Sequence, residues 1–245
     1  MDDRPDNPLL SLMVQAFQKQ GSLSEDDRNA ILSLPAKVRK LEPSSYIVRE
    51  GDTPNFCCVL KSGLAYRQKQ TSGGQRQIVS LNIPGDTLDL QHLFLGIADH
   101  SVQMMTRGEV VFIPMRDLQD VVSRHPGVAR AVSLATLIEA SVFREWVLNV
   151  GRRDARSRLA HLLCEFALRM RMRGLAPGPG YALPITQEQL ADALGLTSVH
   201  VSRMLKMLEA DGLLVRNKRN ITFGSWENLR DIADFNPRYL HFDEN

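Results

Sequence analysis

Residues 186–205 combine two helix-capping hydroxyl groups with a run of polar and basic side chains. The segment reads TQEQLADALGLTSVHVSRML. Thr186 is followed three residues later by Gln189, which is the spacing of a capping box at the start of a helix. Gly195 can adopt the left-handed turn conformation that ends a helix, and Thr197 is a second cap. The pattern predicts two short helices around a glycine turn, a helix-turn-helix.

The second predicted helix carries side chains that could hydrogen-bond to DNA. In a DNA-binding helix-turn-helix, the N-terminal part of this helix lies in the major groove. Arg203 is the side chain there that can bind guanine bidentately, Val199 could touch a thymine methyl group, and His200 could reach a phosphate or a base. Hydroxyl and free N–H groups at helix starts suit phosphates. The candidate DNA-binding residues of the two helices are Thr186, Thr197, Ser198, Val199, His200, Ser202, Arg203 and Lys206.

A basic hairpin is predicted directly after the second helix. Gly212 ends that helix, and the following LLVRNKRNITF is typical of two strands around a turn, a wing. Phosphate contacts would explain the candidate residues Arg216, Lys218 and Arg219 at this turn. Residues 149–220 hold twelve Lys and Arg against six Asp and Glu, although the formal charge of the whole chain is only +2. This excess favours a nucleic-acid face; the alternatives are a solvated helix surface and an αα-hairpin with no role in DNA binding.

The residues before this motif fall into parts with different patterns. Ser24 precedes three acids and an apolar pair, which predicts a helix start after a loose tail and a first short helix. Between about residues 39 and 116, short apolar runs are cut by turns every 8–12 residues, as in an antiparallel sandwich or barrel. We expect a tail with a short helix over residues 1–24 and a β-domain over 25–125. A long helix should follow over 126–150 and a DNA-binding domain over 151–245.

The long helix carries an apolar stripe with 3-4-3-4 spacing. This is the seam pattern of a two-stranded coiled coil, and about two heptads fit. The alternative is that the stripe packs on its own β-domain. Gly151 is a candidate hinge before a second amphipathic helix over 153–172, and 174–180 is a loop by composition. The candidate seam residues are Val128, Ala131, Ala135, Ile138 and Val142.

The composition argues against several classes of protein. The chain has 245 residues, of which 43% are hydrophobic and 24% charged, as in soluble globular proteins. It shows no run of 18 apolar residues and no secretory signal, so we expect a cytoplasmic protein with no membrane partner. Three cysteines do not build a disulfide framework. Because no nucleophile–base pair, phosphate loop or metal-ligand spacing is visible, we expect no enzyme, no catalytic residues and no metal site.

Together these motifs resemble a Crp/Fnr-type transcription regulator over about residues 25–225. The resemblance rests on Glu50-Gly51-Asp52, Ser62-Gly63, Pro84-Gly85-Asp86, the long helix, the hinge-like stretch FREWVLNVGRRDARSRLAHLLCE and residues 186–214. It implies an α+β chain with an N-terminal cyclic-nucleotide-binding-like β-roll, a long dimerisation helix and a C-terminal winged helix-turn-helix. It also implies a homodimer on a pseudo-palindromic operator in double-stranded DNA, with RNA polymerase as a partner if the protein is an activator.

The sequence departs from the cyclic-AMP receptors of that family in the effector region. Those receptors carry Gly-Glu and later Arg-Ser, whereas this chain has Gly-Asp and His-Ser at the corresponding places. A cyclic phosphate favours the bidentate fork of Arg, and a neutral imidazole offers one donor. Asp86 or Asp89 could still bind the ribose hydroxyl. We expect a β-roll that is not specific for cyclic AMP, with the candidate pocket residues Gly85, Asp86, Asp89, His100 and Ser101.

The sequence also argues against an iron–sulfur cluster and against haem. The first 56 residues contain no cysteine, and Cys57 and Cys58, adjacent on a strand, should point to opposite faces. Together with Cys164 they cannot supply four ligands to one cluster. His92 and His100 are only weak haem candidates. No cofactor is required by the sequence, and the alternative function is a ligand or redox sensor whose β-roll, on binding a cyclic nucleotide or haem, controls DNA binding.

The predicted recognition helix departs from the commonest family pattern, Glu-x-x-Ser-Arg. Val199 stands at the Glu position, while Ser202 and Arg203 remain. Glutamate accepts a hydrogen bond from cytosine N4, and valine cannot. We predict that the operator half-site keeps the guanine bound by Arg203 but differs from the common family half-site at the neighbouring base pair.

Overall fold

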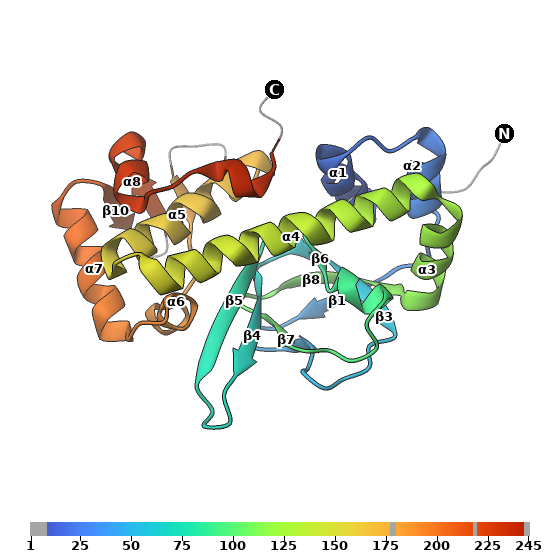
Figure 1. Cartoon of the computed structure of the whole chain (residues 1–245), viewed down its shortest axis with the longest axis horizontal. Coiled ribbons are helices and arrows are strands. Elements are labelled where there is room, and N and C mark those ends of the chain that lie inside the picture. The colour runs from blue at the N-terminus through green and yellow to red at the C-terminus, as the bar shows by residue number, and fades with distance from the viewer. Residues whose placement is uncertain (1–8, 177–179, 218–219, 243–245) are drawn as a thin grey trace. The chain divides into compact units, whose positions relative to one another are not determined.

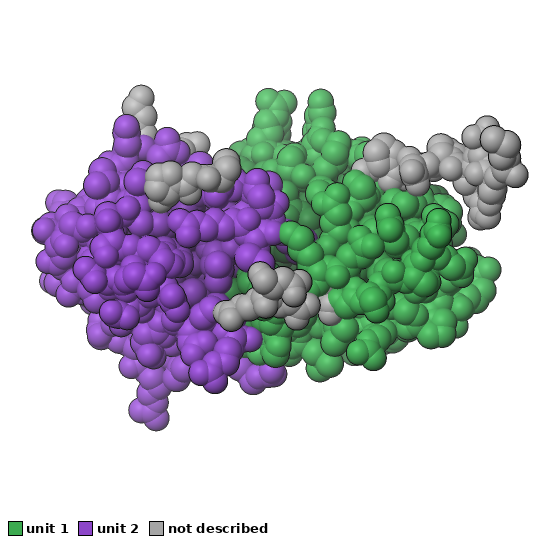
Figure 2. All heavy atoms as spheres, turned by 90° about the horizontal axis from the view of Figure 1, so that it is seen from above, with its two compact units in different colours: residues 1–69, 81–141, 240–245 green, residues 70–80, 142–239 purple. Residues whose placement is uncertain are grey.

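A computed structural model describes residues 9–176, 180–217 and 220–242 of the chain. The chain divides into two compact units, which Figure 2 shows in different colours. Unit 1 comprises Met1–Lys69, Leu81–Ser141 and Leu240–Asn245, and unit 2 comprises Gln70–Ser80 and Val142–Tyr239. The division between the units therefore falls inside the long helix, before the boundary after residue 150 that we expected from the sequence.

The strands of the predicted β-domain form two four-stranded sheets (Figure 1). Most of these strands belong to unit 1, whereas the first five residues of β5 belong to unit 2. The first sheet has the order β1-β8-β3-β6, with β1 (Lys37–Leu41), β8 (Gly108–Pro114), β3 (Phe56–Ser62) and β6 (Thr87–Leu88). The second has the order β2-β7-β4-β5, with β2 (Tyr46–Val48), β7 (Ser101–Met104), β4 (Ala65–Gln70) and β5 (Arg76–Asn82). Strand β8 pairs antiparallel with both of its neighbours, and β7 does so with β2 and β4. The predicted antiparallel sandwich is confirmed.

The turn between β3 and β4 requires glycine. Gly63 has a φ of +81°, and a Cβ atom there would lie 2.7 Å from the backbone oxygen of Arg107. Any other residue would meet both a strained backbone and a steric clash. The Ser62-Gly63 pair is therefore a structural part of the β-roll.

The two faces of β3 contribute to two separate hydrophobic cores. Cys57 belongs to a core shared with α1 (Ser11–Gln20), α2 (Glu25–Leu32), α3 (Met115–Arg124) and the first turns of the long helix. Cys58 belongs to the core between the two sheets. Since adjacent strand residues point to opposite faces, the expectation for these cysteines is confirmed.

The long helix α4 spans Pro126–Arg152 and continues through Gly151. The predicted hinge glycine is therefore helical, and the chain breaks at Arg153 and Asp154 instead. Asp154 caps α5 (Ala155–Met172), accepting hydrogen bonds from the backbone N–H groups of Arg156 and Ser157. By length and composition alone, α4 could cross a membrane, which is weak evidence for a span.

Unit 2 contains the predicted helix-turn-helix and wing. Its further helical elements are α6 (Gln187–Leu194), α7 (Ser198–Ala210), α8 (Trp226–Ala233) and the short η2 (Pro237–Leu240), whose last residue belongs to unit 1. A three-stranded antiparallel sheet has the order β10-β11-β9, with β10 (Leu214–Asn217), β11 (Asn220–Phe223) and β9 (Gly180–Ala182). The sequence analysis missed β9, whose first residue, Gly180, is the last residue of the loop predicted over 174–180. Residues 177–179 of that predicted loop lie outside the described residues.

Candidate nucleic-acid interface

Both helices of the predicted motif begin with the expected caps. Thr186 Oγ1 accepts a hydrogen bond from the backbone N–H of Gln189 at 3.1 Å, and Gln189 Oε1 accepts one from the backbone N–H of Thr186 at 3.0 Å. Thr197 Oγ1 accepts from the backbone N–H of His200 at 3.2 Å. The capping box and the second cap are confirmed.

The two helices pack against each other across a turn at Gly195. Gly195 ends α6 with a φ of +62°, and its N–H donates to the backbone oxygen of Ala191. The apolar side chains of the two helices are buried, among them Leu190, Ala191, Leu194, Val201, Leu205 and Leu208. The motif is therefore held by apolar packing, which leaves the opposite face of α7 for other contacts.

That opposite face of α7 is the candidate DNA surface. Val199 is 78% exposed, and Ser198, Arg203 and Lys206 are exposed too. Ser202 and His200 are half-buried on the same helix. Arg203 forms no hydrogen bond or ion pair with any residue that the structure describes. Its guanidinium is therefore available to an external acceptor.

The wing residue Arg216 has an internal partner. Its Nε and Nη2 atoms donate to the two carboxylate oxygens of Glu209 at 2.8 and 2.7 Å, a bidentate pair. This pair lowers the pKa of Glu209 and raises that of Arg216. Arg216 therefore ties β10 to the end of α7, a role that the predicted phosphate contact did not include. Lys218 and Arg219, the other two wing candidates, lie outside the described residues.

Much of the basic excess in this region neutralises the protein's own acids. Arg153 pairs with Glu145 and Asp234, and Arg156 pairs with Asp211. Charge counting could not reveal this, because the partners lie on other elements of the fold. Among the described residues, Arg203 and Lys206 remain as the exposed cations of α7.

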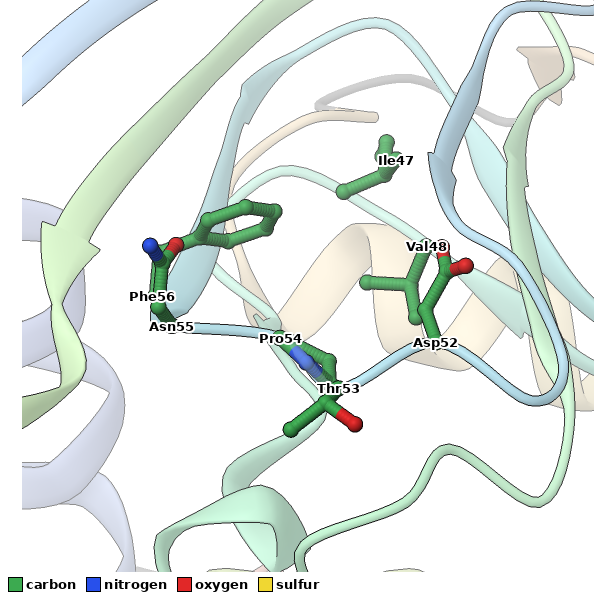
Figure 3. A pocket seen from close by; sticks show the side chains of 7 residues that line it. All are labelled: Ile47, Val48, Asp52, Thr53, Pro54, Asn55 and Phe56. Carbon is green, nitrogen blue, oxygen red and sulfur yellow. The ribbon is translucent and has the colours of Figure 1, made fainter.

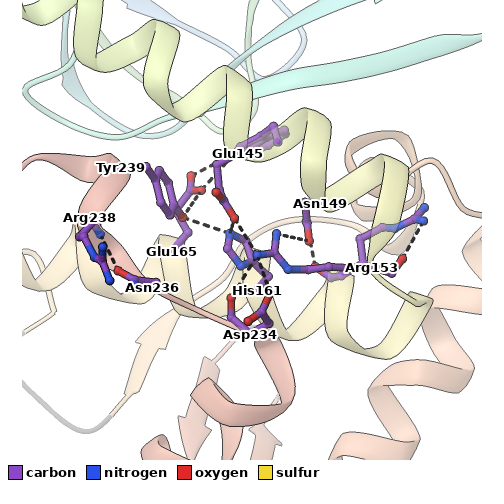
Figure 4. Close-up of polar contacts among 11 residues, drawn as sticks. Glu145, Asn149, Arg153, His161, Glu165, Asp234, Asn236, Arg238 and Tyr239 are labelled. Carbon is purple, nitrogen blue, oxygen red and sulfur yellow. Dashed lines mark hydrogen bonds and ion pairs between the residues drawn. The ribbon is translucent and has the colours of Figure 1, made fainter.

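A buried polar network connects α4, α5 and the C-terminal segment within unit 2 (Figure 4). Glu165 is buried and accepts hydrogen bonds from Trp146 Nε1 at 3.1 Å and from the Tyr239 hydroxyl at 2.8 Å. His161 Nε2 lies 3.1 Å from that same hydroxyl. Burial raises the pKa of Glu165 and, with a contribution from Arg153, lowers the pKa of His161 to about 3. The network connects α5 to α4 and to the C-terminal segment, and α5 also packs against α6 and α7 of the helix-turn-helix.

In unit 1, two of the candidate effector residues, Asp89 and His100, belong to an internal charge cluster. Asp89 is buried with a φ of +65°, and its Oδ1 atom lies 2.9 Å from His100 Nε2 and 3.4 Å from Arg67 Nε. Arg67 is 1% exposed and also pairs with Glu139 on α4. Burial alone would raise the pKa of Asp89, but the hydrogen bond from His100 and the charge of Arg67 hold it below its usual value. The sequence analysis missed Arg67, since a single Arg in a strand resembles a solvent-facing residue.

The remaining effector candidates serve the backbone. Asp86 Oδ2 accepts from the N–H of Ile83 at 2.9 Å and so closes the turn at Gly85. Ser101 Oγ accepts from the N–H of Glu50 at 2.9 Å. Of the five candidates, Asp89 and His100 belong to the charge cluster. Its carboxylates, Asp89, Asp99 and Glu139, would repel a cyclic phosphate beside them, and Arg67 already pairs with two of them. These residues do not fit a cyclic nucleotide.

Two further features of unit 1 bear on ligands. A hollow is lined by Ile47, Val48, Asp52, Thr53, Pro54, Asn55 and Phe56 (Figure 3). It holds no buried charged side chain that could select a ligand. The described residues contain no group of three or more His, Cys, Asp or Glu that could hold a metal ion. Because Cys57 and Cys58 lie in different cores, the cysteines do not fit an iron–sulfur cluster either.

The predicted seam residues of α4 divide into two groups. Val128 and Ala131 are buried in the core of unit 1, as in the alternative in which the stripe packs on its own β-domain. Ala135, Ile138 and Val142 are half-buried. The exposed apolar side chains of α4 are instead Leu137, Val147 and Leu148.

Comparisons with known proteins agree with this architecture. The family model of a Crp-like helix-turn-helix domain matches residues 157–232, and that of a cyclic nucleotide-binding domain matches residues 38–125. The transcriptional activator protein FnrL of Cereibacter sphaeroides is 28% identical over 204 residues, covering 80% of this chain and 79% of its own length. A probable transcriptional activator of Rhizobium leguminosarum is 28% identical over 211 residues, covering 86% of this chain and 84% of its own length.

A solved structure shares the same fold. FixK2 from Bradyrhizobium japonicum superposes with a TM-score of 0.74 at 26% identity, covering 81% of this chain and 98% of the FixK2 chain. The fold, the capped helix-turn-helix and both family matches point the same way. The chain belongs to the Crp/Fnr family of DNA-binding transcription regulators.

Proposed function

We propose that this regulator acts as a homodimer that binds a pseudo-palindromic operator, with one α7 helix in the major groove of each half-site. A twofold dimer presents two identical helices, which matches an operator with two related half-sites. The proposal assigns the protein to the cytoplasm and assigns it no catalytic step.

One observation carries this proposal: the guanidinium of Arg203 is exposed on the outer face of α7 and has no partner among the described residues. Arg pairs bidentately with guanine O6 and N7, and this is the commonest specific contact between proteins and DNA. Ser198, Val199 and Ser202 share that face and would contact neighbouring bases. Thr186 and Thr197, at the starts of their helices, would lie near phosphates.

The exposed side of α4 supports self-association. Leu137 is 63% exposed and Leu148 is 44% exposed, and these two residues are eleven positions apart. Eleven residues are about three helical turns, so both lie on one face. We assign the dimer contact to this face. This assignment differs from the predicted seam at Val128 and Ala131, which are buried.

The effector domain is proposed to act without cyclic AMP. In its charge cluster, Asp89 pairs with Arg67 and His100, His100 also contacts Asp99, and Arg67 also pairs with Glu139. The β-roll then serves as a scaffold for the dimer helix. Since two of the relatives are described as transcriptional activators, we propose activation, with RNA polymerase as the partner.

A binding experiment tests the proposal. An operator would be selected from random duplexes with the full chain, and the affinity for it measured by gel shift. Replacing Arg203 by Ala should cost about 1–3 kcal/mol and relax the preference at one base position in each half-site. Arg124, an exposed arginine of unit 1, supplies the control Arg124→Ala. Unchanged operator affinity in the Arg203 variant would refute the assignment.

A further inference from the structure

Two arginines at the start of α5 hold the helix-turn-helix from within unit 2. Arg158 Nη1 donates to the backbone oxygen of Leu194, the last residue of α6, at 2.6 Å. Its Nη2 atom donates to the backbone oxygen of Arg153 at 3.1 Å. The last carbonyl groups of a helix have no partner within that helix. Arg158 therefore provides a charged donor for the end of α6.

The position of Arg158 is itself restrained. Its backbone oxygen accepts a hydrogen bond from Asn149 Nδ2 at 3.2 Å, and Asn149 is buried. A Cβ atom on Gly195 would lie 3.4 Å from Val150 Cγ1 and 3.8 Å from Arg158 Nη1. The turn of the helix-turn-helix thus sits directly against the end of α4 and the start of α5.

Arg156 holds the other helix in a similar way. Its Nη2 atom pairs with Asp211, the residue that ends α7. The first turn of α5 therefore contacts the ends of both helices, α6 through Arg158 and α7 through Arg156. A cation at the C-terminal end of a helix also stabilises the helix dipole.

We propose that Arg156 and Arg158 are positioning residues, which set the orientation of α7 for specific DNA recognition without touching DNA. The inference rests on the proposed function of α7. Both guanidinium groups are directed to protein acceptors. They would therefore support operator affinity only through the orientation of α7, and not through a contact with DNA. Non-specific binding depends mainly on charge near phosphates.

Specific binding, which depends on the orientation of α7, and non-specific binding, which depends on charge, can be measured separately. Affinities of the full chain are measured for the selected operator and for a scrambled duplex of equal length, between about 50 and 200 mM salt. Arg158→Gln should lower operator affinity by about tenfold, as expected for loss of a charged hydrogen bond. The affinity for scrambled DNA and the slope of log affinity against log salt should stay unchanged. Arg158→Lys keeps one charged donor and should recover part of the loss.

Asp211→Asn gives the sharpest comparison. Removing an acid next to a DNA-binding helix should strengthen all DNA binding if only charge matters. Loss of the partner of Arg156 should instead weaken operator binding by about threefold, less than a full charged hydrogen bond because the pair is partly exposed. The folded state of each variant is checked by circular dichroism. If Arg158→Gln does not fold, the Arg158→Lys and Asp211→Asn variants decide the question.

Each outcome is informative. Arg203→Gln serves as the reference for a DNA contact, since loss of a phosphate or base contact by a cation lowers the salt slope or the base preference. A salt slope that falls by about one in Arg158→Gln would overturn the inference in favour of a phosphate contact. A lower melting temperature with unchanged operator affinity would overturn it in favour of a purely structural role. A native chain that prefers no operator would refute the proposed function itself.

Discussion

The Nε2 atom of His100 lies 2.9 Å from Oδ1 of Asp89 within unit 1. The Nδ1 atom of the same ring lies 2.7 Å from Oδ1 of Asp99, so both ring nitrogens face carboxylates. An imidazole can donate from both nitrogens only when it is doubly protonated. Arg67 pairs with both Asp89 and Glu139, so the cluster places three carboxylates against one guanidinium and one imidazole.

From this cluster we predict that cyclic AMP does not bind tightly. The carboxylates of Asp89, Asp99 and Glu139 would repel the negative charge of a cyclic phosphate bound at this cluster, and Arg67 already pairs with Asp89 and Glu139. Titration calorimetry with cyclic AMP should show no saturable heat up to about 1 mM ligand, and operator affinity should not change when the nucleotide is added. A dissociation constant in the micromolar range would contradict the prediction.

The pH dependence of unit 2 should reflect His161. This side chain is 1% exposed, and burial together with Arg153 lowers its pKa to about 3. In the unfolded chain the pKa is about 6.5, so below that pH the unfolded state takes up a proton that the folded state does not. The contribution of His161 to the free energy of unfolding should therefore fall as the pH drops from 6.5 toward 3, by at most about 1.4 kcal/mol per pH unit. Glu165, whose pKa burial raises, contributes in the opposite direction, so the effect of His161 is measured as a difference between variants.

Urea unfolding at several pH values checks this prediction. Both tryptophans of the chain, Trp146 and Trp226, lie in unit 2, so their fluorescence reports on the unfolding of that unit. His161→Gln should flatten the dependence between pH 6.5 and 5. His241→Gln, at an exposed histidine, should leave it as in the native chain. Equal slopes in all three chains would show that His161 is not the responsible group.

The helix-turn-helix could be predicted from the sequence because its signals are local. Thr186 and Gln189 are three residues apart, and glycine can adopt the left-handed conformation of Gly195 without steric strain. The partners of the arginines could not be predicted, because they depend on tertiary contacts. Arg158 meets a carbonyl 36 residues away. Arg67 pairs with Glu139 on α4, which is distant in the sequence.

The three cysteines should be unreactive in the folded protein. Burial raises the pKa of Cys57 and of Cys164 to about 12 and that of Cys58 well above its usual value. Thiolates are the reactive form, so a disulfide reagent at pH 8 should modify them slowly. All three should react at once in urea. Fast reaction of one thiol in the native chain would show that this side chain is accessible.

Dimerisation should depend on Leu137 and not on Val128. A charge at an apolar contact must be desolvated, so Leu137→Glu should raise the dimer dissociation constant by about tenfold or more in analytical ultracentrifugation. Val128→Ala removes two methyl groups from the core of unit 1, so it should lower stability by about 1–3 kcal/mol and leave dimerisation intact. If Val128→Ala weakened the dimer and Leu137→Glu did not, the dimer contact would instead lie on the apolar stripe predicted from the sequence.

The base preference of α7 should change when Val199 is replaced by Glu. Val199 is 78% exposed on the face that carries Arg203. A glutamate there could accept a hydrogen bond from cytosine N4, so operators with cytosine next to the guanine should gain about tenfold over those with thymine. Val215→Glu, on the exposed face of β10, adds the same charge outside the recognition helix. Because a charge alone acts on all sequences equally, that control should weaken every operator to the same extent, and a shift of base preference in the control would refute the assignment to Val199.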